Sequence, residues 1–135
     1  VNMLTFQALK NNKITVFGGD QTRPNIHIND MIRVYQHFLE NSIESGCYNA
    51  GFENISILKI AQMVSEKLDS EIIVSESNDP RSYRQNSDKL LKTGFVQKFG
   101  VNDAINDVIS AYKNGKLTES DQCYTVKSMK KLNLK

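Results

Sequence analysis

An arginine follows a glycine-led turn near the start of the chain. Arg23 lies in the stretch GGDQTRPNIHINDM, where a glycine pair leads into polar residues, a short alternating run and a carboxylate. A guanidinium group can hold two phosphate oxygens with parallel hydrogen bonds, and it keeps its charge at any working pH. Glycines allow the backbone a tight approach to such a ligand. The alternative is an ordinary surface arginine in a salt bridge.

A second arginine-containing stretch, DPRSYR, lies in a polar loop much further along the chain. Arg81 is its first basic residue, and Tyr83 and Arg84 follow closely. Two arginines from separate loops would hold a doubly charged group better than one. The alternative for Arg81 and its neighbours is a solvated loop.

Other residues that could carry chemistry favour structural roles. His27 and His37 are ten positions apart on different predicted elements, so neither is assigned a reaction. Asp30 stands where a helix cap is expected, and we interpret it as a cap and not as an acid catalyst. Cys47 and Cys123 form no Cys-x-x-Cys motif, which argues against a metal site and suggests free thiols in a reducing cytoplasm.

The composition is that of an ordinary globular chain. Its 135 residues suffice for one small domain with a core, and 39% of them are hydrophobic and 24% charged. A net charge of +2 does not indicate binding to nucleic acid or to a membrane. No apolar run approaches the roughly 20 residues of a membrane span. We expect a cytoplasmic protein without a signal peptide and, since the first residues look like the inside of a helix, a fragment.

Helical and extended patterns alternate along the sequence. The predicted strands are ITVF at 14–17, NIHI at 25–28, GCYNAG at 46–51 and EIIVSE at 71–76. The predicted helices cover 3–9, Asn29 or Asp30 to about 41, a segment capped by Ser56, 87–92, and a segment from a cap at Asn102 to a stop at Gly115. The pattern predicts an α/β domain over 1–115 with one thin sheet, and a basic, at most loosely helical tail over 116–135.

Three motifs in series carry a family resemblance. GGDQTRPNIHINDM, CYNAGFENISILKIAQMV and DPRSYRQNSDKLLKTGF, in this order and spacing, resemble the C-terminal part of an extended short-chain dehydrogenase/reductase. The most similar group is the NAD-dependent epimerase/dehydratase family of nucleotide-sugar enzymes. The resemblance covers roughly residues 1–113 and implies the substrate-binding part of that fold, with few short strands, several helices and an incomplete Rossmann sheet.

The resemblance implies a substrate-binding role for six residues. Arg23 and Arg81 match positions that contact the diphosphate of a nucleoside-diphosphate sugar, and Tyr83 and Arg84 lie beside the second position. Thr15 and Phe17 match positions along the nucleobase, although an ordinary core strand would also explain them. Asn49 ends a family-typical strand, where closing a turn is the simpler role.

The catalytic parts of the family are missing from this sequence. Its glycines never form the GxxGxxG turn that holds the pyrophosphate of NAD, so we expect NAD in an intact parent enzyme and no cofactor on this chain. The family also uses a Tyr-x-x-x-Lys pair, in which the lysine lowers the tyrosine pKa. Tyr112 and Lys116 have this spacing, but Gly115 interrupts the turn between them. We therefore predict no catalytic residue and no metal site.

The missing half also affects how the chain behaves. The helix after Asp30 and the strand at 46–51 would lose the residues that normally cover their apolar faces. We therefore expect self-association or a need for a missing N-terminal half. The alternative is a non-catalytic binding or assembly module that uses these exposed faces for a protein partner.

Overall fold

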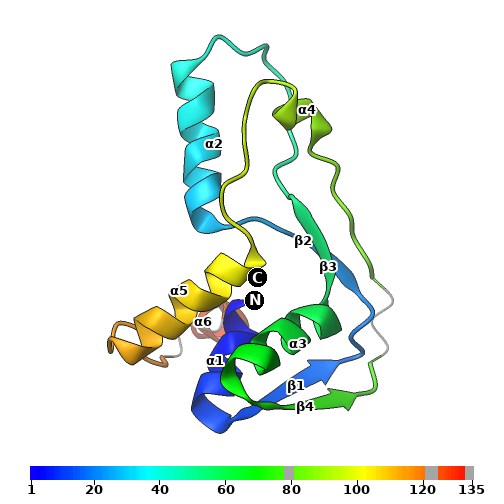
Figure 1. Ribbon diagram of the computed structural model, residues 1–135, viewed down its shortest axis with the longest axis vertical. Helices are drawn as coiled ribbons and strands as arrows, with labels where there is room; N and C mark the ends of the chain where they lie inside the picture. Colours follow the sequence, from blue (N-terminus) through cyan, green and yellow to red (C-terminus); the bar gives the residue numbers. More distant parts are fainter. Residues whose placement is uncertain (78–80, 121–124, 133–135) are drawn as a thin grey trace.

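The computed structural model describes residues 1–77, 81–120 and 125–132 as an α/β arrangement of six helices and four short strands. Figure 1 shows a lower part, where α1 and α3 lie against one side of a pair of strands and α5 lies beside α1, and an upper part that contains α2 and α4. The elements in chain order are α1 Asn2–Asn11, β1 Lys13–Phe17, β2 Thr22–Asn25, α2 Ile28–Glu40, β3 Glu53–Ser56, α3 Ile57–Leu68, β4 Glu71–Ser75, α4 Asp88–Leu91, α5 Val101–Lys113 and α6 Thr125–Lys131.

The four described strands form two separate pairs. Strands β1 and β4 are parallel, with Ile14 opposite Ile72, whereas β2 and β3 are antiparallel, with Arg23 opposite Ile55. The α/β class and the few short strands are thus confirmed. The expected single thin sheet is wrong, because the chain leaves β1 through a glycine turn and pairs β2 with β3 elsewhere.

The lower core forms where one face of β1 meets α1, α3 and α5. Ile14 and Val16 are buried on this face, as strict alternation along a half-covered strand requires. Ser56 caps α3 as predicted, because its hydroxyl accepts a hydrogen bond from the Lys59 backbone at 3.2 Å. The buried members of this core are Ala8, Ile14, Val16, Ile60, Ala61, Val64, Val101 and Ile105.

A second, smaller core lies in the upper part. Val34 of α2, Leu90 of α4 and Phe95 are buried there, and Phe52 stacks on Phe95 with ring centroids 5.7 Å apart. Tyr48 packs edge-on against Phe38 at 4.8 Å. The two cores share no residue, so the connections between them determine how the two parts are held together.

Two helix starts differ from the predictions. Helix α2 begins at Ile28, and its cap is His27, whose Nδ1 accepts from the Asn29 backbone at 3.1 Å. Neither Asn29 nor Asp30 is the cap. Helix α5 begins at Val101, before the expected cap Asn102.

The early start of α5 has a clear cause in carboxylates that accept its first backbone N–H groups. Glu53 of β3 accepts from the Val101 backbone at 2.6 Å. Asp103 accepts from the Gly100 backbone at 2.8 Å. Acidic groups at a helix N-terminus also complement its dipole.

Two predicted strands are wrong. NIHI is not a strand, because β2 ends at Asn25 and the following residues start α2. The segment 46–51 pairs with no strand in the described part of the chain, and the Gly51 backbone N–H and C=O both bond to the Ser87 hydroxyl at 3.0 Å. The apolar pattern at 46–51 reflects contact with the upper core and not a sheet.

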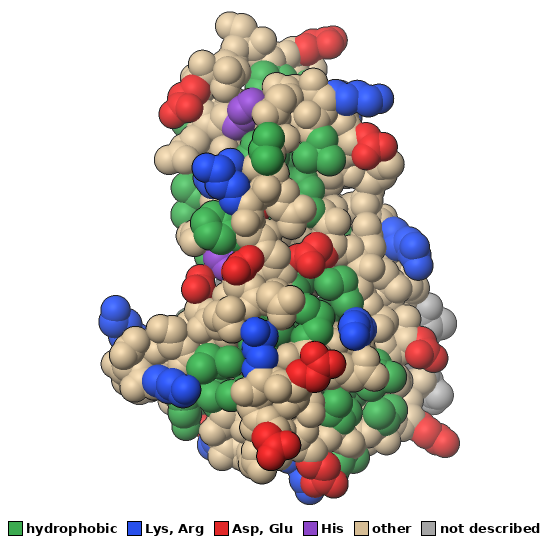
Figure 2. Space-filling view, viewed as in Figure 1, with side chains coloured by type: hydrophobic (Ala, Val, Ile, Leu, Met, Phe, Trp, Pro, Cys, Tyr) green, Lys and Arg blue, Asp and Glu red, His purple; other side chains and the backbone are tan. Residues whose placement is uncertain are grey.

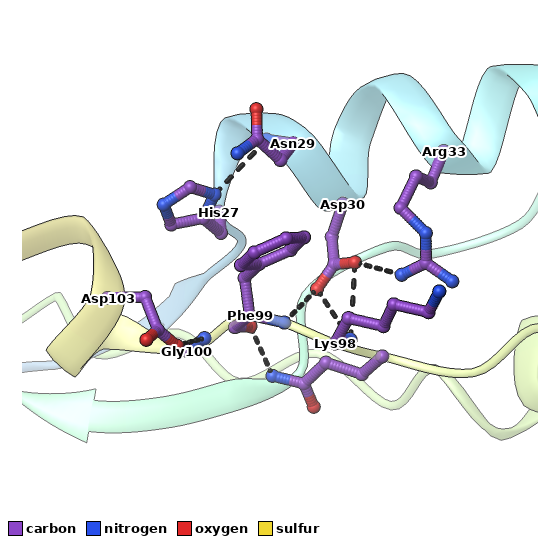
Figure 3. A network of polar contacts seen from close by, with 9 residues as sticks. His27, Asn29, Asp30, Arg33, Lys98, Phe99, Gly100 and Asp103 are labelled. Carbon is purple, nitrogen blue, oxygen red and sulfur yellow. Dashed lines mark hydrogen bonds and ion pairs between the residues drawn. The ribbon is translucent and has the colours of Figure 1, made fainter. Parts of the chain in front are cut away.

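A buried carboxylate connects α2 to the chain ahead of α5 (Figure 3). Asp30 is fully buried and accepts backbone hydrogen bonds from Lys98 at 3.1 Å and from Phe99 at 2.8 Å. Arg33, one helical turn on, donates to the same carboxylate. The Phe99 ring in turn stacks on His27 with centroids 5.0 Å apart. A buried charge is tolerated only when it is paired and hydrogen-bonded. The Asp30 carboxylate meets both conditions, through Arg33 and the two backbone N–H groups.

We predict that Asp30→Asn lowers the free energy of unfolding by about 2–4 kcal/mol, because it leaves buried donors and Arg33 without the carboxylate. Urea unfolding of the purified chain followed by circular dichroism measures this. Glu40→Gln, at the exposed far end of the same helix, should change stability by less than about 0.5 kcal/mol. Equal stability of the two variants would contradict the assigned role of Asp30.

Candidate functional site

The carboxyl ends of the parallel strands position the candidate site. Strands β1 and β4 both end at the same edge, where the Gly18 backbone donates to the Ser75 carbonyl at 2.8 Å (Figure 1). From this edge one connection leads into β2, which carries Arg23, and the other leads toward Arg81. The carboxyl edge of parallel strands is where such folds commonly bind ligands.

The turn between β1 and β2 depends on its glycines. Gly18 and Gly19 have φ angles of 75° and 117°, a backbone region that disfavours other residues. A Cβ on Gly19 would lie 3.0 Å from the Leu58 Cβ, so this position is also crowded. Gln21 braces the turn by accepting from the Gly19 backbone at 2.7 Å. The turn therefore fixes where β2 begins.

Arg23 sits on β2 and not on the preceding turn. Its Nη1 donates to the carbonyl of the preceding residue, Thr22, at 3.0 Å and to the Arg81 carbonyl at 2.6 Å. Its guanidinium carbon lies 5.1 Å from the centroid of the Tyr83 ring, in a cation–π arrangement. The structure thus brings Arg23 to Arg81 and Tyr83, which lie 58 and 60 positions further along the sequence.

The segment after Arg81 runs along β2 and β3 and is tied to them by hydrogen bonds. The Tyr83 backbone donates to the Thr22 carbonyl at 2.9 Å. The Gln85 backbone donates to the Asn54 side chain at 2.9 Å, and the same Asn54 amide donates back to the Gln85 carbonyl at 3.0 Å. Asn49 donates to the Asn86 carbonyl at 3.2 Å, so its side chain fastens this segment.

Both residues predicted to contact the nucleobase lie on the outer side of β1. Thr15 and Phe17 alternate with the buried Ile14 and Val16, and Phe17 is 64% exposed. The Phe17 carbonyl accepts from the Gln21 side chain at 3.2 Å, at the base of the glycine turn. An exposed aromatic ring at a strand end is available to stack on a flat ligand.

Arg84 lies apart from the other arginines. It lines a polar cleft of about 480 Å³ together with Asn54, Asn86 and Asp88, and neither Arg23 nor Arg81 lines that cleft. Tyr83 thus contacts Arg23, whereas the adjacent Arg84 lines this other cleft.

The Tyr112/Lys116 pair has no catalytic arrangement. The Tyr112 ring packs edge-on against Phe6 with centroids 5.9 Å apart, and Gly115 ends the helix with a φ angle of 65°. His37 bonds to the Thr93 hydroxyl at 2.9 Å within the upper core. These contacts are structural.

His27 forms a polar contact that sequence reasoning missed. Because its Nδ1 accepts from the Asn29 backbone, its Nε2 carries the proton and faces Asp107 of α5 at 3.3 Å. Both residues line a largely apolar groove of about 430 Å³ between the start of α2, α1 and α5. No local signal in the sequence links His27 to a helix 80 positions away.

No group of three or more potential metal ligands converges within the described ranges. No helix in the described part of the chain is long and apolar enough to cross a membrane.

Comparison with known proteins identifies the fold. No protein-family model matches the chain. Vestitone reductase from Medicago sativa is 29% identical over 93 residues, which are 65% of this chain and 28% of that protein. Two solved structures match more of the chain. dTDP-glucose 4,6-dehydratase from Bacillus anthracis, in complex with NAD, matches with a TM-score of 0.69 and 19% identity, over 83% of this chain and 38% of that one.

The second structure is UDP-glucuronic acid 4-epimerase from Bacillus cereus, in complex with UDP-glucuronic acid and NAD. It matches with a TM-score of 0.69 and 23% identity, over 82% of this chain and 38% of that one. The chain therefore shares the fold of a part of these two enzymes, in line with the resemblance that the sequence motifs carry. The chain spans less than two fifths of the length of these two structures.

We predict that Asn54→Ala frees the segment after Arg81 from β3. Because the reciprocal Asn54–Gln85 bonds are lost, amide exchange at Gln85 should accelerate at least about tenfold, as expected for local opening. Hydrogen exchange measured by NMR gives this rate directly. Gln62→Ala, on the exposed side of α3, is the matched control and should leave the exchange rate at Gln85 unchanged. Unchanged exchange in Asn54→Ala would mean that other contacts hold the segment.

Proposed function

We propose that this chain binds the nucleoside-diphosphate part of a nucleotide-sugar substrate. The observation that carries the proposal is the contact of Arg23 with the Arg81 carbonyl, which joins the two arginine stretches at one place beside the parallel strand ends. Guanidinium groups suit phosphate oxygens because they offer several donors in a fixed plane. Arg23 and Arg81 would hold the diphosphate, and Tyr83 orients the Arg23 guanidinium through its ring.

Thr15 and Phe17 would contact the nucleobase in this proposal. The exposed Phe17 ring offers an apolar surface for stacking, and Thr15 on the same side of β1 offers a hydroxyl. Arg84 has weaker support, because it lines the separate polar cleft.

The parent activity we propose is NAD-dependent epimerisation or dehydration of a nucleotide sugar. The support is the shared fold with an epimerase solved with UDP-glucuronic acid and NAD. The described residues would position substrate, and the NAD-binding glycine turn and catalytic Tyr-x-x-x-Lys pair would come from elsewhere. We also propose a cytoplasmic location, because Cys47 and Cys123 suit free thiols in a reducing compartment.

A second candidate function is a non-catalytic binding or assembly module. The observation that favours it is the row of exposed apolar side chains on α2. A surface of this kind fits self-association, a protein partner or the remaining part of a longer chain.

We predict that UDP or dTDP binds the purified chain and that Arg23→Ala and Arg81→Ala each weaken binding by about 1.5–3 kcal/mol, roughly 10- to 150-fold. Lysine at either position should restore only part of the lost affinity, because an ammonium group cannot bind bidentately. Isothermal titration calorimetry measures the dissociation constants.

The matched control is Lys113→Ala, which removes a positive charge at the exposed end of α5 and should leave binding unchanged. Melting curves of each variant separate lost affinity from lost folding. Wild-type affinity in both arginine variants would contradict the diphosphate site.

We also predict that this chain alone does not bind NAD. The reason is the absence of a glycine-rich GxxGxxG turn from its sequence. Titration of NADH followed by its fluorescence should show no saturable signal at micromolar chain concentrations. Saturable binding would show that the chain carries its own dinucleotide site.

A further inference from the structure

One residue of β3, Glu53, connects the start of α5 to the strand that carries Arg23. Glu53 is half-buried, and its Oε2 accepts from the Val101 backbone at 2.6 Å. Its own carbonyl accepts from the Asn25 side chain at 3.0 Å. The same Asn25 amide nitrogen donates to the Arg23 carbonyl at 2.8 Å. Three hydrogen bonds in series therefore run from the first residue of α5 to the backbone of Arg23.

The pairing of β2 with β3 supports this series of bonds. Asn25 and Glu53 lie directly opposite each other in the antiparallel register. The Phe52 backbone donates to the Asn25 carbonyl at 2.9 Å, so both the main chain and the side chain of Asn25 hold the end of β2. A pair of short strands is only marginally stable by itself. Contacts at the ends of the pair therefore determine how firmly it is held.

Gly100 leaves room for the Glu53 carboxylate at the start of α5. A Cβ on Gly100 would lie 3.0 Å from Glu53 Oε2, closer than ordinary van der Waals contact. The Gly100 backbone is extended, so it is this contact that disfavours a side chain here. Several acidic side chains reach the surface where the upper part of the molecule meets the lower part (Figure 2). Carboxylates are stabilised near the N-terminus of a helix by its dipole, which favours the position that Glu53 occupies.

We propose that Glu53 is a positioning residue that, through Asn25, sets where Arg23 meets its contacts. Arg23 reaches both the Arg81 carbonyl, at 2.6 Å, and the Tyr83 ring, 5.1 Å from its centroid, so a displacement of its backbone alters both. The consequence for nucleotide affinity rests on the proposed function and deepens it. Every contact in the series lies between residues of this chain, so the series does not depend on what covers the molecular surface.

The test measures Glu53→Ala in two ways. Isothermal titration calorimetry with UDP gives the dissociation constant. The NMR resonance of the Arg23 Nε–H group reports its place beside the Tyr83 ring, because an aromatic ring shifts nearby proton resonances. We expect Glu53→Ala to move this resonance in the ligand-free chain and to weaken UDP binding about 3- to 30-fold, as for a residue that acts through its neighbours. Glu53→Gln keeps an oxygen acceptor for the Val101 N–H and should restore both properties.

The matched control is Asp103→Ala. Asp103 also accepts a backbone hydrogen bond at the start of α5, from Gly100 at 2.8 Å, but it belongs to α5 itself and so does not connect this helix to β3. The control variant should destabilise the start of α5 and leave both the Arg23 resonance and the UDP affinity unchanged. It therefore separates the positioning of Arg23 from the stability of α5.

Asn25→Ala breaks the same series at its next bond and serves as a second variant if Glu53→Ala fails to fold. It should produce the same change in the Arg23 resonance. If the two residues act through one series, the double variant should bind UDP at most about twofold more weakly than the weaker-binding single variant, whereas independent effects would multiply.

Three results would overturn the proposal: an unchanged Arg23 resonance in both Glu53→Ala and Asn25→Ala, an equal change of this resonance in Asp103→Ala, or effects of the two single variants that multiply. If the wild-type chain fails to bind UDP, the proposed nucleotide site is wrong, and the Arg23 resonance of the ligand-free variants still decides the role of Glu53. Failure of one proposal is thus distinguishable from failure of the other.

Discussion

The buried carboxylate of Asp30 is the contact on which the arrangement of this chain depends. The two hydrophobic cores share no residue, so burial of apolar surface alone does not set their relative position. Asp30 accepts from two consecutive backbone N–H groups, at Lys98 and Phe99, immediately ahead of α5. This bond set joins the helix of the upper core to the helix that closes the lower core. Hydrogen bonds to a buried charge are both stronger and more directional than apolar contacts, which suits them to this task.

The proposed nucleotide site also depends on backbone contacts between segments that are distant in the sequence. The parallel pair β1–β4 sends both of its outgoing connections from one edge, and antiparallel pairing of β2 with β3 then fixes the position of Arg23. The segment after Arg81 is held by backbone and amide hydrogen bonds along this second pair. Strand geometry thus sets the backbone positions, and in the proposed site the arginine and aromatic side chains would supply the binding chemistry.

The sequence predicted those parts of the fold that depend on local patterns. Alternation identified β1, and the serine cap identified the start of α3. Predictions from the sequence were wrong where contacts with distant residues determine the local structure. Glu53 accepts a hydrogen bond from the Val101 backbone, so α5 begins before Asn102. The Ser87 hydroxyl bonds to the Gly51 backbone, which we had predicted to lie in a strand. For the candidate site, the family resemblance implied that Arg23 and Arg81 act on one ligand, which stays a prediction, whereas no pattern in the sequence indicated that Arg84 lines a different cleft.

We propose that the β1–β4 edge, with Arg23 and Arg81, binds a nucleoside diphosphate. NMR titration of the isotope-labelled chain with UDP tests it most directly, because it reports each residue separately. The account predicts saturable chemical-shift changes centred on Arg23, Arg81, Tyr83 and Phe17, with little change in the groove beside His27. Saturable changes confined to that groove, or none at millimolar UDP, would contradict it.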